Sequence, residues 1–120
     1  MHTAKTRVLL PALAILALAT ASAGQEPAKK VSEAEATSAA ISKVAPVYPS
    51  TARQLKIEGQ VELDVFIGLE GSVEDVKIVS GNPILTKPAA DAFRKWKFRP
   101  FAEDGKPIRV MAHFTVTFKL

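Results

Sequence analysis

The sequence has no cysteine, and its 120 residues include only one tryptophan and one tyrosine. Without cysteine no disulfide can form, so side-chain packing must stabilise any fold. Cysteine-ligated metal sites are excluded for the same reason, and His113 is the only histidine beyond residue 2, so we expect no metal site. The G-x-S-x-G motif and glycine-rich phosphate-binding loops are also missing from the sequence. We therefore expect no cofactor, no catalytic residue and no enzymatic activity.

The sequence also has no apolar run of the usual membrane-spanning length. Residues 8–19 are almost wholly apolar, but about a dozen residues fall short of the roughly 20 that a spanning helix needs. Lys5 and Arg7 precede this run, and the small residues Ala21-Ser22-Ala23 follow it. This order is typical of a cleavable signal peptide, predicted over residues 1–23, and indicates export. The alternative is an uncleaved signal anchor, which would keep the protein on the inner membrane.

The chain carries little net charge. The formal net charge of +4 includes Lys5 and Arg7 of the predicted signal peptide, so the processed chain would be only mildly basic. A strongly basic face is what electrostatic binding of nucleic acid requires. We therefore predict no nucleic-acid partner.

Large apolar residues are scarce in residues 24–43, which are rich in Ala, Ser, Glu and Lys. This composition predicts a polar tether between the signal peptide and a domain over residues 44–120. Ser32 and Glu35 match a capping box, so a short helix is expected within the tether.

The clearest pattern in the sequence lies in residues 59–81. Val61, Leu63, Val65 and Ile67 occupy every second position, as in a strand with one face in the core. Residues 68–71, Gly-Leu-Glu-Gly, supply the positive-φ positions of a short turn. A second strand over residues 73–80 completes an antiparallel hairpin.

Two helices and a third strand are expected around this hairpin. A helix of about two turns begins at Pro49, and a longer amphipathic helix follows Thr86, the expected N-cap, up to Trp96. Residues 110–120 alternate again and form the third strand. A right-handed crossover through the longer helix would bring this strand beside the first.

The predicted fold class is therefore α+β. It consists of a three-stranded antiparallel sheet, order 2-1-3, with two helices packed on one face. Trp96 is expected at the centre of the core, between Val65, Ile78 and Phe114. The third strand is left at an edge of the sheet.

Motifs within residues 44–120 together resemble the C-terminal domain of the TonB family. These motifs are YP-x-x-A at residues 48–52, IEGQV at residues 57–61 and WKFRP at residues 96–100, in this order. Pro46, Gly71, Val73 and Gly105, together with the closing alternating strand, continue the resemblance.

The resemblance implies a periplasmic domain that takes part in TonB-dependent transport. In this family the domain binds the TonB box, a short extended segment of an outer-membrane transporter. Main-chain hydrogen bonds give affinity and side-chain contacts give selectivity when a segment adds to a sheet edge as a strand. Some of the expected partner-binding residues lie in the edge strand, where they act through their backbones: Val110, Ala112, Phe114 and Val116. The others form the approach loop that precedes the first helix of the domain: Pro46, Val47, Tyr48 and Pro49.

The chain differs from a full TonB-family transducer, which has a permanent inner-membrane helix and a long proline-rich spacer. Here about 20 residues separate the predicted signal peptide from the domain, and they reach about 70 Å when fully extended. An inner-membrane motor is therefore expected as a partner only if the N-terminus is an uncleaved anchor facing the periplasm. The alternative function is a self-associating or envelope-binding structural domain without energy transduction, for which a homodimer would form through the edge strand.

Overall fold

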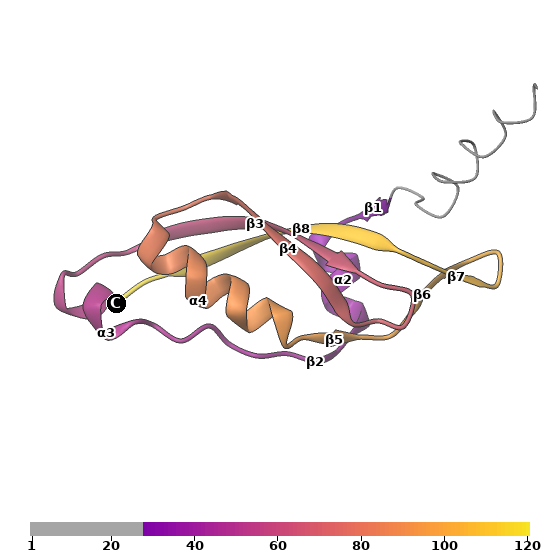
Figure 1. Cartoon of the computed structure of the whole chain (residues 1–120), viewed down its shortest axis with the longest axis horizontal. Coiled ribbons are helices and arrows are strands. Elements are labelled where there is room, and N and C mark those ends of the chain that lie inside the picture. The colour runs from indigo at the N-terminus through magenta and orange to yellow at the C-terminus, as the bar shows by residue number, and fades with distance from the viewer. Residues whose placement is uncertain (1–27) are drawn as a thin grey trace, which may run out of the picture.

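The computed structural model describes residues 28–120, so the predicted signal peptide lies outside the described residues. Short strands and a helix precede the expected domain, and a small hairpin precedes the last strand (Figure 1). In chain order the elements are β1 (Lys29–Val31), α2 (Glu33–Ala39), β2 (Ala40–Ser42), α3 (Ser50–Gln54), β3 (Gly59–Ile67), β4 (Val73–Ser80), α4 (Pro83–Arg94), β5 (Lys97–Phe98), β6 (Phe101–Glu103), β7 (Lys106–Ile108) and β8 (Val110–Phe118).

The main sheet has four strands in the order β1-β8-β3-β4. β3 pairs antiparallel with both β4 and β8, whereas β1 pairs parallel with β8. The α+β class is confirmed, but the sheet is larger than the expected three-stranded antiparallel one and is mixed. Within it β3 lies between β4 and β8. β1 has only three residues, Lys-Lys-Val, too few to show a strand period in the sequence.

The central hairpin forms as its alternation predicts. Every second residue of β3 from Val61 to Ile67 is buried. The turn is closed by the Gly68 N–H, which donates to the Ser72 carbonyl at 2.8 Å, and by the Gly71 N–H, which donates to the Gly68 carbonyl at 3.0 Å. Gly71 has φ +90° and its carbonyl accepts the Phe98 N–H at 2.9 Å, so the turn is also anchored to β5.

The long helix α4 begins earlier than the sequence predicts. Asn82, not Thr86, is the N-cap, and its side-chain oxygen accepts the Ile84 N–H at 2.9 Å. Pro83 occupies the first helical position, where its missing N–H has no cost. Residues 81–83, Gly-Asn-Pro, therefore end β4 and also begin the helix.

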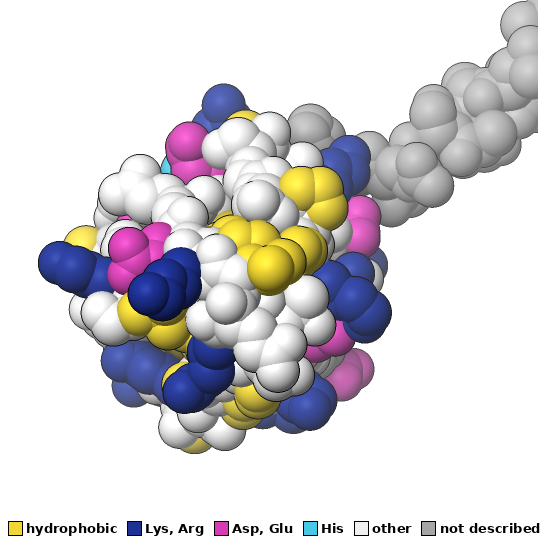
Figure 2. Space-filling view, turned by 90° about the vertical axis from the view of Figure 1, so that its left-hand side faces the viewer, with side chains coloured by type: hydrophobic (Ala, Val, Ile, Leu, Met, Phe, Trp, Pro, Cys, Tyr) yellow, Lys and Arg dark blue, Asp and Glu magenta, His cyan; other side chains and the backbone are white. Residues whose placement is uncertain are grey.

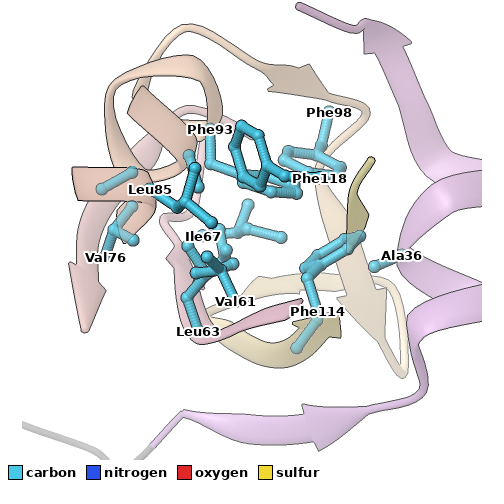
Figure 3. Packing of buried hydrophobic residues seen from close by; sticks show 14 of the residues in the cluster. Ala36, Val61, Leu63, Ile67, Val76, Leu85, Phe93, Phe98, Phe114 and Phe118 are labelled. Carbon is cyan, nitrogen blue, oxygen red and sulfur yellow. The ribbon is translucent and has the colours of Figure 1, made fainter. Parts of the chain in front are cut away.

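Within the described residues, one hydrophobic cluster joins the sheet to helices α2, α3 and α4 (Figure 3). α4 contributes Leu85, Ala89 and Phe93, while α2 and α3 each contribute a fully buried alanine, Ala36 and Ala52. Figure 3 shows Ala36 facing Phe114 of β8. Phe98 is among the largest fully buried side chains.

The position and neighbours predicted for Trp96 are wrong in part. Trp96 packs against Phe114, as expected, but it is only partly buried at the rim of the cluster. Ile78 is 44% exposed and does not belong to the core. Alternation places Ile78 on the same side of β4 as Val76, but it does not reveal how much of a side chain on this edge strand is covered.

The residues interpreted as a polar tether lie against the domain. β1 pairs with β8, and β2 pairs with β5. The helix between them, α2, begins at the expected cap: the Ser32 hydroxyl accepts the Glu35 N–H at 3.0 Å. Ala36 anchors this helix in the core. None of the helices within residues 28–120 is long and apolar enough to cross a membrane.

Candidate partner-binding site

The residues expected on the edge strand all lie in β8, but β1 covers the first part of that edge. Lys29, Lys30 and Val31 are in register with Val110, Met111 and Ala112. Val110 and Ala112 therefore lie beside a strand of the same chain, while Phe114 and Val116 lie beyond its end. The uncovered edge of β8 begins at about His113.

The pairing with β1 shows which way the backbone of β8 faces. The Lys29 N–H donates to the Arg109 carbonyl at 3.0 Å. Backbone groups alternate in direction along a strand, so the odd-numbered residues of β8 face the β1 side and the even-numbered residues face β3. Beyond β1, the edge therefore offers the backbone groups of Thr115 and Thr117. Within residues 28–120 neither threonine has a strand neighbour on that side.

The four named strand residues are consequently placed differently from the expectation that their backbones bind the partner. Val110, Ala112, Phe114 and Val116 face β3 with their backbones and the core with their side chains. Alternation in the sequence identifies the face of each side chain, but the side to which each N–H points depends on the neighbouring strand.

The approach loop is fixed beside the far end of β8. The Tyr48 ring packs edge-on against Phe118, with centroids 5.5 Å apart, and its hydroxyl donates to the Ile57 carbonyl. The Arg53 guanidinium carbon lies over the Tyr48 ring, 5.5 Å from its centroid. Val47 is 75% exposed. Figure 2 views the end of the molecule where α3 and the C-terminus lie, and apolar side chains are exposed there among Lys and Arg.

A groove of about 510 Å³ runs along the core side of the β8 edge. Its aromatic residues are Trp96, Phe93 and Phe114. Trp96 stacks on Phe93 with centroids 4.6 Å apart, and its Nε1–H donates to the Val44 carbonyl at 2.9 Å. This hydrogen bond holds residues 43–46 at one side of the groove. The remaining residues around it are Glu33, Thr37, Lys43, Ala45, Pro46, Thr115 and Val116.

The sequence does not predict this groove. The capping box indicated a helix at residues 32–35, but nothing in the sequence placed that helix against β8. Thr37 of α2 and Thr115 of β8 are far apart in the sequence, and only the tertiary fold brings them to the same groove.

On the opposite, solvent-facing side of β8, His113 bridges two carboxylates of β3. Its Nδ1 lies 2.8 Å from an oxygen of Asp64, and its Nε2 lies 3.0 Å from an oxygen of Glu62. Glu62 also accepts a hydrogen bond from the Ser80 hydroxyl, so the cluster links β8, β3 and β4. Lys30 of β1 lines the same hollow as His113 and Asp64. The described residues contain no group of three His, Cys, Asp or Glu side chains suited to a metal ion.

The cluster predicts a pH dependence of stability. Hydrogen bonds to Asp64 and then Glu62 raise the pKa of His113 above its ordinary value of 6.5. Because folding raises this pKa, the contribution of His113 to stability is complete below pH 6.5 and is lost as the pH rises through the folded-state pKa. The hydrogen bond from His113, followed by that from Ser80, lowers the pKa of Glu62 below its ordinary value of 4.5, so its contribution is lost in acid. The combined contribution is greatest between these two ordinary values.

We therefore expect His113→Gln to lower the melting temperature most at about pH 5–6 and least at about pH 8. Thermal unfolding of both proteins, followed by circular dichroism across this pH range, measures the difference. Lys30→Gln is the control, because it changes a residue that lines the same hollow and leaves His113 and its two carboxylate partners in place. A difference in melting temperature between wild type and His113→Gln that stayed constant at every pH would contradict this role of the His113 cluster.

Comparison with known proteins shows which family this domain resembles. Residues 44–120 match the family described as Gram-negative bacterial TonB protein C-terminal. The chain is 34% identical to Protein TonB of Vibrio cholerae over 79 residues, which cover 64% of this chain and 32% of that protein. It is 36% identical to Protein TonB of Escherichia coli over 70 residues, which cover 57% of this chain and 28% of that protein. The chain thus spans only about a third of the length of these curated relatives.

Solved structures show the same fold. The solution structure of the Pseudomonas aeruginosa TonB C-terminal domain aligns with a TM-score of 0.59 at 28% identity, covering 68% of this chain and 84% of that one. The TonB2 protein of Vibrio anguillarum aligns with a TM-score of 0.52 at 37% identity, covering 67% and 78%. The resemblance seen in the motifs is confirmed. Because the family match covers well over half of the sequence, the chain belongs to the TonB C-terminal domain family.

Proposed function

We propose that this chain is a periplasmic TonB-like module that binds the TonB box of an outer-membrane transporter, in support of TonB-dependent transport. The segment adds as a strand to the edge of β8 beyond β1, and the approach loop at residues 46–49 lies next to its path. The observation that supports this proposal most strongly is the open edge at Thr115 and Thr117, in a domain of this family. The predicted signal peptide supports a periplasmic location, and an inner-membrane motor is a partner only if that segment is an uncleaved anchor.

The other edge of the sheet, β4, is less suited to strand addition. Glu74, Asp75 and Lys77 place charges along it, and charged side chains discourage pairing at an edge. The Val76 N–H is already bonded to the Asp75 carboxylate at 2.8 Å. We therefore assign binding to β8 and its backbone groups at odd-numbered positions.

The decisive experiment is the binding of a synthetic TonB-box peptide to the protein. We expect slowed amide hydrogen exchange at Thr115 and Thr117 when the peptide is present, because their N–H groups gain acceptors. Protection confined to β4, or no protection anywhere, would contradict the proposal.

A proline at the edge provides a second measure. Thr115→Pro removes one outward N–H, and we expect peptide affinity to fall by about tenfold or more while the domain stays folded. Thr115→Ala is the matched control, because it keeps the N–H and removes only the side chain. If Thr115→Pro bound the peptide as tightly as Thr115→Ala, backbone recognition at this position would be wrong.

Self-association is the second candidate function, since an uncovered edge also suits a second copy of the chain. The exposed apolar side chains Val47, Leu55 and Leu120 favour it. A molecular mass that rises with protein concentration and does not respond to peptide would support this alternative. It would also count against transporter binding.

A further inference from the structure

The groove beside the β8 edge has the position required to select the side chain of an added strand. Thr115 supplies outward-facing backbone groups and also lines the groove. Phe114 and Val116 turn their side chains to the same, core-facing side. The edge and the groove are therefore parts of one continuous surface.

The chain's own strand at this edge shows how an occupant would be oriented. β1 adds to β8 with Val31 in register with Ala112, and Val31 packs against the hydrophobic core. Side chains of residues in register on neighbouring strands lie on the same face of a sheet. A residue in register with Phe114 or Val116 would therefore also face the core side, and there the groove lies open.

From this placement we infer that the groove is a specificity pocket for one large aliphatic or aromatic side chain of the partner strand. This inference rests on the proposed function and specifies the partner: an extended peptide with such a residue in register with Phe114 or Val116. The segment comes from another protein, because the chain's own edge strand, β1, already pairs with the preceding residues of β8, Val110 to Ala112.

The residues around the groove fit an apolar side chain. Trp96, Phe93 and Phe114 form an aromatic surface, and Val44, Pro46 and Val116 extend it. Glu33 and Lys43 bring one charge of each sign, so the groove has no net charge that would attract an ionic group. The volume of about 510 Å³ is ample for a single large side chain.

Trp96 gives a direct readout, because it is the only tryptophan in the sequence. The probe is a TonB-box peptide without tryptophan, in which each position in turn carries Leu or Ala. We expect one position at which the Leu peptide shifts the Trp96 emission and binds about tenfold or more tightly than the Ala peptide, as burial of an apolar side chain predicts. The Ala peptide should still protect Thr115 and Thr117 from hydrogen exchange.

Filling the groove tests the same site from the protein side. Thr37→Phe puts a ring into the groove from α2, and we expect it to cancel the preference for Leu over Ala. Ala34→Phe is the matched control, because it adds the same ring to an exposed position of α2 that does not line the groove. This control should keep the full preference.

The outcomes separate this inference from the proposed function. If peptides protect Thr115 and Thr117 but no position shows the preference, or if Thr37→Phe leaves the preference intact, the pocket is refuted and strand addition stands. If no peptide protects β8, both are refuted. A Trp96 emission shift that depends on protein concentration without peptide would mean that a second copy covers the groove, which also overturns the inference.

Discussion

Gly71→Ala is expected to cost at least about 3 kcal/mol of unfolding free energy, because two effects add at this position. Gly71 has φ +90°, a conformation that side-chain-bearing residues adopt only with strain. A Cβ built there would also lie 1.9 Å from the Phe98 carbonyl oxygen, which is backbone and cannot rotate away. The turn and β5 would have to separate, weakening the hydrogen bond from the Phe98 N–H to the Gly71 carbonyl.

The chain contains a matched control in Gly105. Its φ of +79° is similar, but a Cβ there would meet nothing within 4 Å. Gly105→Ala should therefore cost only the backbone strain, about 1–2 kcal/mol. Urea unfolding of both variants measures the difference. Equal losses would show that close contact with β5 does not hold the turn in place.

The second large effect is expected from Phe98→Ala, at about 3–5 kcal/mol. Phe98 is only 2% exposed, and its ring lies 5.8 Å from that of Trp96 and 6.4 Å from that of Phe101. Removing the ring would leave a cavity beside the rings of Trp96 and Phe101. In a domain of this size each kcal/mol lowers the melting temperature by about 4–8 °C, so the loss is readily measured by thermal unfolding.

Phe66→Ala is the matched control for Phe98. Phe66 is also a strand phenylalanine, but it is only partly buried and has the Lys77 ammonium 5.3 Å from its ring centroid. We expect it to cost no more than about 1 kcal/mol. A larger loss from Phe66→Ala than from Phe98→Ala would contradict the assignment of the core.

The regular elements could be predicted because their signals are local. The alternation in β3 and β8 and the turn between β3 and β4 follow from the order of residues alone. The same holds for the Ser32 cap of α2, because a side chain and an N–H three residues away settle it. The start of α4 was misplaced since both Asn82 and Thr86 are good capping residues, and the sequence does not rank them.

The partner-binding surface was only partly predictable because it depends on contacts between distant residues. The sequence pointed to residues 110–116 and to the approach loop, but not to β1 on the first part of that edge. The sequence also could not show that Thr115 and Thr117 present their N–H groups at the open edge, because the direction of each N–H follows from the register of β8 with β1 and β3.

By itself, the sequence determined the α+β class, the hairpin, the closing strand and the family, because short-range periodicity and ordered motifs encode them. Only the tertiary structure decided that β1 joins the sheet in parallel, that α2 and residues 43–46 line a groove, and that Trp96 lies at the rim of the hydrophobic cluster. The physical reason is that backbone pairing and packing are non-local. A three-residue strand such as Lys29–Val31 forms only where a neighbouring strand offers its hydrogen-bonding groups.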